Sequence, residues 1–381
     1  MRRVNILLIH TVQSGDTLYE IGKKYGITIE QLIKANGNTV LPTLIVGQSV
    51  IVPTATEKTR SVLTNGYAYP NIRPESLEGF APMLSLITPF SYGITDDGAL
   101  IPTDDAALIS DAEDLGISPL LIVTSLTESG SFSSERAARI LGSAELTDTL
   151  IQSIITQLEK YDYYGVDVDF EYIPPQYGSS YSEFIKTLKA RLAPLGYKVF
   201  VSVAPKTSRG QRGLLYEAHD YKSLGEAADY VLVMTYEWGY TYGPPMAVAP
   251  IDKVRQVLTF ASEEIPPEKL LMGIPNYAYD WTLPFEKGRA AESMSNAEAV
   301  ERARRVGANI EFDGTAKTPF YRYFDDAGRQ HEVWFEDARS IQAKFSLLAE
   351  LSLAGFSVWN IMSFYRPLDT LATATFNITK I

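Results

Sequence analysis

Three carboxylic acids alternate with apolar residues in one short stretch, residues 164–172, which reads Tyr-Gly-Val-Asp-Val-Asp-Phe-Glu-Tyr. Side chains two residues apart lie on the same face of a β-strand, so Asp167, Asp169 and Glu171 would share one face. Like charges held this close raise the pKa of at least one carboxyl, which then keeps its proton near neutral pH and can donate it. The stretch therefore predicts general acid catalysis.

The fold decides where this acidic face points. On a solvent-exposed antiparallel strand the same alternation would be an ordinary polar face. In a barrel strand, Val166, Val168 and Phe170 would pack against the covering helices and the acids would point into the barrel. Glu171 would then lie nearest the carboxyl end of its strand, where barrel enzymes place their catalytic groups.

The pattern of the chain beyond residue 60 favours such a barrel. Apolar runs typical of buried parallel strands alternate with helical patterns, as a parallel sheet covered by helices requires. Eight runs qualify, at residues 61–69, 84–92, 118–125, 164–171, 198–204, 230–236, 270–275 and 356–363. We therefore predict the α/β class and a (β/α)8 TIM barrel over residues 61–381. A long excursion after the seventh run, about residues 282–336, predicts a small α+β insertion with a hairpin of residues 320–324 and 331–335 around Gly328.

A separate unit precedes the barrel, at residues 9–53. A short strand, the turn Ser14-Gly15-Asp16, two short helices and a closing strand give a βααβ order, with Asp16 and Thr28 as the expected helix caps. The unit resembles the LysM module, through His10-Thr11-Val12, Ser14 to Leu18, Tyr25-Gly26-Ile27, Asn36 and Leu44 to Gln48. Residues 54–60 are expected to be a linker.

LysM modules bind N-acetylated glycans in a shallow groove between two turns. The resemblance implies that one side of this groove is formed by Gly15, Asp16, Thr17 and Leu18. Leu41 and Ile45 would form the facing side.

The acid run itself resembles the signature of glycoside hydrolase family 18, whose members include chitinases and cell-wall N-acetylglucosaminidases. In that family the N-acetyl oxygen of the substrate attacks the anomeric carbon, so no carboxylate nucleophile is needed. The resemblance implies that Glu171 protonates the glycosidic oxygen. It implies that Asp169 orients the acetamido group and stabilises the oxazolinium charge, and that Asp167 tunes the proton position.

Three further stretches resemble family positions that bind the reacting sugar. Met234-Thr235-Tyr236-Glu237 matches Met-x-Tyr-Asp, in which the tyrosine hydroxyl holds the acetamido group. Trp359 matches the tryptophan beneath the sugar. Asn276 and Tyr277 lie in a Gly-x-Pro-x-Tyr stretch, where packing is as plausible an interpretation as binding.

Two positions depart from the family pattern. Tyr164 stands where an acid usually precedes the glycine, and Glu237 stands where aspartate is usual. These departures leave open a noncatalytic glycan-binding coat protein. The acid run is otherwise complete, so we favour an enzyme.

Composition excludes several other classes. Forty-six acidic and 34 basic residues give a net charge of −12, so we expect no nucleic-acid partner. Three histidines and no cysteine leave too few ligands for a His- or Cys-rich metal site, and no glycine-rich phosphate loop follows a strand, so we expect neither metal nor cofactor. No run is long enough to cross a membrane, and the apolar segment 6–9 is too short for a conventional signal peptide.

The combination of module and barrel resembles the spore germination glycosidases, which act on cortex peptidoglycan. It implies an N-acetylglucosaminidase that cuts β-1,4 bonds after N-acetylglucosamine with retention of configuration. We expect a monomer located in the spore outer layers or the cell wall. A chitinase or chitooligosaccharide hydrolase remains the alternative enzyme, because the same site chemistry would serve it.

Overall fold

The computed structural model describes residues 7–54, 57–58 and 60–381, and part of the expected linker, residues 55, 56 and 59, lies outside this range. Eight parallel strands form a closed barrel in the order in which they occur in the chain, because the last strand pairs with the first. They are β3 (Ser61–Ala68), β4 (Leu86–Pro89), β7 (Ser118–Thr124), β8 (Gly165–Asp169), β9 (Lys198–Val203), β10 (Tyr230–Val233), β11 (Leu270–Pro275) and β17 (Gly355–Trp359). The predicted (β/α)8 barrel is confirmed, and each predicted strand overlaps an observed one.

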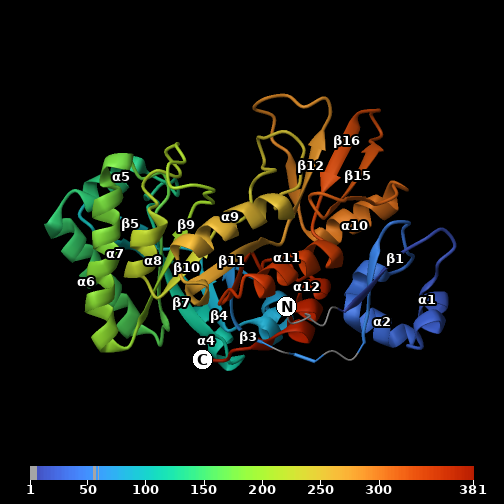
Figure 1. Ribbon diagram of the computed structural model, residues 1–381, viewed down its shortest axis with the longest axis horizontal. Helices are drawn as coiled ribbons and strands as arrows, with labels where there is room; N and C mark the ends of the chain where they lie inside the picture. The colour runs from blue at the N-terminus through green and yellow to red at the C-terminus, as the bar shows by residue number, and fades with distance from the viewer. Residues whose placement is uncertain (1–6, 55–56, 59) are drawn as a thin grey trace.

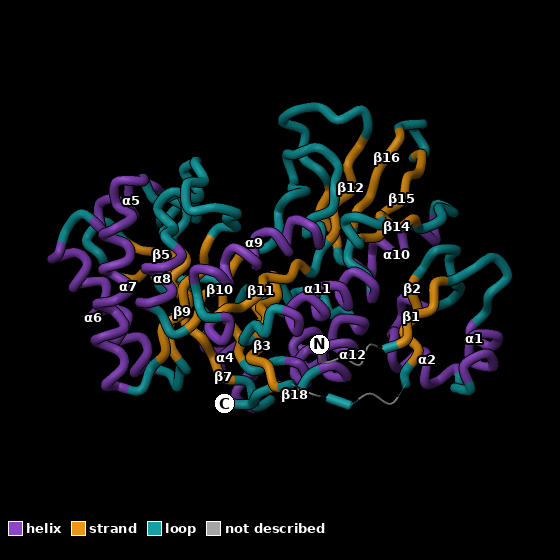
Figure 2. The backbone as a smooth tube through the Cα atoms, in the orientation of Figure 1, coloured by secondary structure: helices purple, strands orange, loops and turns teal. Residues whose placement is uncertain are grey.

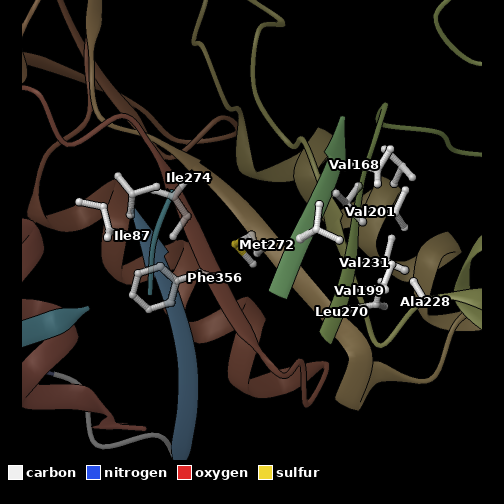
Figure 3. Packing of buried hydrophobic residues seen from close by; sticks show 14 of the residues in the cluster. Ile87, Val168, Val199, Val201, Ala228, Val231, Leu270, Met272, Ile274 and Phe356 are labelled. Carbon is white, nitrogen blue, oxygen red and sulfur yellow. The ribbon is translucent and has the colours of Figure 1, made fainter. Parts of the chain in front are cut away.

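The barrel strands bury both faces, which explains why they read as apolar runs. Outward side chains such as Val168, Val201 and Val231 belong to the large cluster beneath the helices (Figure 3). Inward side chains form a second cluster that fills the barrel, including Tyr67 and Phe200. The barrel therefore has a packed interior, and its mouth is the place where a barrel enzyme carries its site.

Helices follow the barrel strands and cover them (Figures 1 and 2). They are α3 (Pro74–Phe80), α4 (Ala106–Asp114), α5 (Ser134–Leu141), α6 (Ala144–Lys160), α7 (Gly178–Leu192), α8 (Tyr221–Ala227), α9 (Ile251–Glu264), α11 (Ala338–Glu350) and α12 (Arg366–Thr375). Short elements complete the barrel part: β5 (Gly93–Ile94), β6 (Leu100–Ile101), β18 (Asn377–Ile378), η2 (Ala81–Met83), η3 (Pro175–Tyr177), η4 (Ala193–Leu195) and η5 (Pro267–Lys269). In the described part of the chain, none of the helices has the length and apolar character needed to span a bilayer.

The segment between β11 and α11 forms an antiparallel sheet and one helix that rise above the barrel (Figure 1). Its elements are β12 (Ala278–Thr282), β13 (Glu292–Met294), α10 (Asn296–Arg305), β14 (Glu311–Asp313), β15 (Thr318–Phe324) and β16 (Gln330–Trp334). The predicted hairpin around Gly328 corresponds to β15 and β16, which pair with Phe320 opposite Trp334. We call this segment the insertion.

The N-terminal module has the predicted βααβ order. Its elements are β1 (Leu8–Thr11), α1 (Leu18–Tyr25), α2 (Ile29–Asn36), η1 (Gly37–Val40) and β2 (Ser49–Val52), with β1 and β2 antiparallel. Thr28 caps α2 as expected, in a capping box with Gln31. The expected cap of α1 was wrong by one residue: Thr17 caps it. The Asp16 carboxylate instead accepts hydrogen bonds from His10 and from the Gln13 amide.

The module packs firmly on the insertion and on the barrel helices, beside α10 and α12 (Figure 1). The Ile310 amide donates to the Val46 carbonyl at 2.9 Å, and the Arg339 guanidinium donates to the Gly47 carbonyl at 3.0 Å. Ile45 joins an apolar cluster of the insertion that includes Ile310. The segment from residue 45 to residue 47 is therefore an interdomain contact.

Gly47 is expected to be required for this contact. Its φ is +84°, and a Cβ there would meet the Ile310 carbonyl oxygen at 1.7 Å. Gly47→Ala therefore combines backbone strain of about 1–2 kcal/mol with a steric clash against the Ile310 backbone, which cannot shift without disrupting its own contacts. We expect hydrogen exchange at the Ile310 amide to accelerate by about tenfold or more as the module separates.

Gly26→Ala is the matched control. Gly26 also has a positive φ, +70°, but nothing lies within 4 Å of the place where a Cβ would be. It carries the strain without the interdomain clash. Equal exchange at Ile310 in the two variants would contradict the role given to Gly47.

Candidate active site

Strand β8 carries the predicted acids and places them as the alternation indicated. Val166, Val168 and Phe170 are fully buried in the outer cluster beneath the helices. Asp167 and Asp169 point the other way, and Glu171 follows two residues after the strand ends. The acidic face therefore runs along the barrel interior to its mouth.

Asp167 is the most enclosed of the three acids, at 1% exposure. The Tyr67 hydroxyl donates to its Oδ2 at 2.6 Å, and the Ser202 hydroxyl lies 3.0–3.1 Å from both carboxylate oxygens. Burial raises the pKa of Asp167 to about 6, although both hydrogen bonds act to lower it. These contacts fix the orientation of the Asp167 carboxyl.

Asp169 and Glu171 both have raised pKa values, and both face a cavity. Burial raises the pKa of Asp169 well above its usual range, and the nearby charges of Glu171 and Asp167 raise it further. Burial raises the pKa of Glu171 to about 7. The Asp169 Oδ1 has no hydrogen-bond partner among the described residues. The pair thus offers a carboxylic acid that is protonated near neutral pH beside a carboxyl with an oxygen available to a ligand.

His219 holds the backbone that leads to Glu171. The Ala204 amide donates to its Nδ1 at 2.9 Å, so the ring proton is on Nε2, which donates to the Phe170 carbonyl at 3.0 Å. Burial lowers the pKa of His219 to about 4, which keeps the ring neutral. A neutral histidine therefore ties the loop after β9 to the residue preceding Glu171.

A cavity of about 420 Å³ at the barrel mouth brings several predicted residues together. We call it the catalytic cavity. Asp169 and Glu171 line it together with Tyr236, whose pKa is raised mainly by burial and further by the charges of both acids. Trp359 contributes an aromatic wall, packed edge-on against Phe90 with ring centroids 4.8 Å apart. The site residues predicted from the sequence that line this cavity are Asp169, Glu171, Met234, Tyr236, Glu237 and Trp359.

A second cavity, of about 460 Å³, adjoins the first and shares Glu237 and Trp359 with it. We call it the side cavity. The Tyr277 hydroxyl donates to Glu237 Oε1, and the Tyr279 hydroxyl reaches the same oxygen at 3.2 Å. Enclosure by the cleft raises the pKa of Glu237, while these two hydrogen bonds act to lower it. Two tyrosines of the insertion side thus hold the residue that replaces the usual aspartate.

Asn276 borders the side cavity, but its amide is already engaged. Its Nδ2 donates to the carbonyls of Asn360 and Ser363 at 2.9 and 3.0 Å, and its Oδ1 accepts from Asn296 at 3.3 Å. At 4% exposure it braces the loop after β17. Its predicted contact with substrate remains a prediction, with packing the better supported interpretation.

The residues predicted to bind glycan in the module are not all available. Gly15 and Thr17 are exposed, while Asp16, Leu18 and Leu41 are partly buried. Ile45 does not fit the prediction, because its side chain is 8% exposed and packs into the insertion. The apolar character that suggested a sugar contact at this position instead serves the interdomain contact.

Sequence reasoning missed the residues that support the acids or extend the cavity. Ser202 had a usable signal, since it is a polar residue at an inward position of an otherwise apolar strand, 198–203. Tyr67 and His219 had none, because their partners lie about a hundred and about fifty residues away in the chain. The remaining aromatic lining residues of the catalytic cavity are Phe90, Phe132, Tyr172, Tyr216, Trp238 and Tyr240.

Tyr164, the departure from the family pattern, lies at the opposite end of β8 from Glu171. Its ring joins the interior cluster of the barrel and contacts Phe200 with centroids 6.3 Å apart. An aromatic ring therefore replaces the missing acid at the closed end of the barrel. The contacts of Asp167, Asp169 and Glu171 do not include it.

A closed (β/α)8 barrel with paired acids at its mouth defines a glycosidase-type site. Comparison with known proteins agrees: residues 122–363 match glycosyl hydrolases family 18, and residues 10–53 match the LysM domain. The chain belongs to glycosyl hydrolases family 18 and is a glycosidase with an N-terminal LysM module.

Particular relatives extend over both parts. The cortical fragment-lytic enzyme of Bacillus anthracis is 38% identical over 98% of this chain and 100% of its own length. The crystal structure of the Bacillus cereus spore cortex-lytic enzyme SleL is 34% identical and has a TM-score of 0.92, covering 98% of this chain and 99% of that one. A chitinase from Chromobacterium violaceum, at 24% identity and a TM-score of 0.76 over 82% of this chain and 98% of its own, shares the fold.

The raised pKa of Glu171 predicts the pH dependence of the reaction. As the predicted general acid, Glu171 would act in its protonated form, which is lost as the pH rises through about 7. We expect kcat/KM to fall about tenfold per pH unit on the alkaline side of that value. A pH–rate profile of the wild-type enzyme tests this, and a rate that stays level from neutral to clearly alkaline pH would contradict it.

Proposed function

We propose that this enzyme cleaves β-1,4 bonds after N-acetylglucosamine in spore cortex peptidoglycan, with cortex fragments as its substrate. The substrate is suggested by relatives that match along nearly the entire chain and are named cortical fragment-lytic enzymes. The type of reaction is suggested by the acids and aromatic residues of the catalytic cavity.

The reaction we propose is substrate-assisted and retaining. Glu171 gives its proton to the glycosidic oxygen while the acetamido oxygen of the bound sugar attacks its anomeric carbon. The leaving sugar departs with that proton, and an oxazolinium ion forms. Asp169 accepts from the acetamido N–H and balances the positive charge. Glu171, now a carboxylate, then takes a proton from water as the water opens the oxazolinium ring with overall retention.

Supporting residues complete this scheme. Tyr236 donates its hydroxyl to the acetamido group, and Trp359 lies beneath the sugar ring. Met234 and Glu237 contact the same sugar, and Asp167 tunes the proton position, since its charge helps to raise the pKa of Asp169. Tyr277 positions Glu237.

One observation carries the proposal: Asp169 and Glu171 line the same cavity as Tyr236 and Trp359, and Asp169 has an oxygen with no partner among the described residues. A buried carboxyl oxygen without a partner is costly unless a ligand satisfies it. The acetamido N–H of an N-acetylated sugar is such a ligand. A purely structural acid cluster would be expected to satisfy its own members.

The test is mass spectrometry of products released from purified cortex fragments. We expect new reducing ends at N-acetylglucosamine, and none at muramic acid. Chitin oligomers are digested in parallel, since faster cleavage of these than of cortex fragments would favour the chitooligosaccharide hydrolase. Binding of cortex fragments without any cleavage would favour the noncatalytic coat protein and overturn the proposal.

A further inference from the structure

A third hollow, of about 480 Å³, lies between the LysM module and the barrel. We call it the junction groove. The end of α2 and η1, residues 36–39, forms one wall. Helix α10 and residues 364–366, before and at the start of α12, form the others. The groove exists only because the module is docked, so neither domain alone would provide it.

The junction groove continues the path of the two cavities. Glu298 of α10 borders both the side cavity and the junction groove. In the loop after β17, Ser363 lines the side cavity and the next residue, Phe364, lines the groove. The side cavity in turn shares Glu237 and Trp359 with the catalytic cavity. The three hollows therefore follow one another from Glu171 to the module.

The position of the acid gives this path a direction. Glu171 must stand beside the leaving oxygen, and the sugar that reacts lies on Trp359. Glu171 lines the catalytic cavity and is absent from the lining of the side cavity, whereas Trp359 lines both. The side cavity and the junction groove therefore extend the path on the glycone side, away from the leaving group.

The groove offers polar groups that a sugar can bind. Asn38 is exposed and Thr39 is partly exposed on the module wall, facing Glu301 of α10. Among the other lining residues, the Arg366 guanidinium stacks on the Phe364 ring at 4.5 Å. Because the guanidinium covers the ring, the groove offers a glycan mainly hydrogen-bonding groups, which suit its hydroxyl and acetamido groups.

The groove is also held in a fixed shape. Arg304 of α10 donates to the Thr43 carbonyl at 2.9 Å and to the Thr39 carbonyl at 2.7 Å. The Thr370 hydroxyl of α12 donates to the Ala35 carbonyl at 2.8 Å. These contacts join the module directly to α10 and α12, so binding would not have to bring the two domains together.

We propose that the junction groove is a distal glycone subsite, which binds the N-acetylated glycan that extends from the catalytic cavity. The inference rests on the proposed function for its substrate. In this arrangement the module forms one wall of the substrate cleft. The increase in kcat/KM that it provides therefore grows with the length of the glycan. An anchor on a flexible tether would instead help substrates of every length equally.

Two bulky substitutions test the proposal from opposite walls. Asn38→Trp fills the groove from the module, and Ala297→Trp fills it from α10, where Ala297 is partly exposed. Lys23→Trp on the exposed surface of α1 is the matched control. The substrates are cortex glycan strands stripped of their peptide stems, as a tetrasaccharide and as an octasaccharide or longer, and a long strand that keeps its stems.

We expect both groove variants to lower kcat/KM for the long strand about tenfold, to the value for the tetrasaccharide, and to leave the tetrasaccharide unchanged. Lys23→Trp should match the wild type on both. Wild-type rates for the long strand in both groove variants would overturn the proposal, as would an equal loss on the two lengths. A loss seen only with stem-bearing strands would show that the groove takes peptide, which also overturns it. Failure of the proposed function is distinct, because the wild type would then cleave neither strand.

Discussion

Glu171→Gln is expected to lower kcat on cortex fragments by about 10²–10⁴-fold, the usual contribution of a general acid. Glutamine keeps the shape of the side chain, but its amide protons are not acidic enough to be transferred to the glycosidic oxygen. The fall in kcat is measured in discontinuous assays that quantify the reducing ends released. Glu183→Gln, an exposed glutamate on α7, is the control and should keep wild-type activity. A loss below tenfold in Glu171→Gln would remove this residue from the role of acid.

The same variant should be more stable than the wild type at neutral and alkaline pH. The folded pKa of Glu171, about 7, exceeds its ordinary value of 4.5, so the folded enzyme binds this proton more tightly than the unfolded chain. Stability therefore falls as the pH rises between these values, by up to about 3 kcal/mol, and glutamine avoids this loss. We expect a higher Tm for the variant at about pH 8 and no difference near pH 4. An inactive variant that is also less stable would point to misfolding.

Asp169→Asn has the second largest expected effect, a fall in kcat of about 10²–10³-fold. The neutral amide can no longer balance the oxazolinium charge, and it is a poorer acceptor for the acetamido N–H. The loss in kcat is large because Asp169 is buried, so water cannot take over the stabilisation of the positive charge. Asp162→Asn, at the exposed approach to the other end of β8, is the control.

An aryl glycoside of N-acetylglucosamine separates the two acids. Its leaving group departs without a proton, so Glu171→Gln should recover much of its activity on this substrate. Asp169→Asn should not recover, because oxazolinium formation is still needed. If both variants recovered equally, the distinct roles assigned to Glu171 and Asp169 would be wrong.

The barrel and the acid face could be predicted from sequence because both follow from local backbone geometry. A strand has a two-residue period, so the order of residues 164–171 places Val166, Val168 and Phe170 on one side and the acids on the other. The structure agrees, with Asp167 buried at 1% exposure inside the barrel. The other seven runs likewise identified strands of the barrel, because buried parallel strands are mostly apolar on both faces.

The prediction that Ile45 contacts glycan was wrong, because the local sequence pattern does not show which other domain packs against this residue. Its place in the LysM pattern indicated a groove residue, and the module does fold as the pattern requires. Whether an apolar side chain on the module surface meets a sugar or another domain depends on what packs there. In this chain that neighbour is Ile310, more than 260 positions further along the sequence.

The sequence by itself determined the class of the barrel, the alternation that gathers the acids, and the presence of a glycan-type module, since each depends on residues close together in the chain. Only the tertiary structure decided how the acids are held and how far the cleft extends. Tyr67 reaches Asp167, His219 reaches the residue before Glu171, and the module closes the junction groove. These contacts join residues far apart in sequence, and only the packing of the complete chain selects their partners.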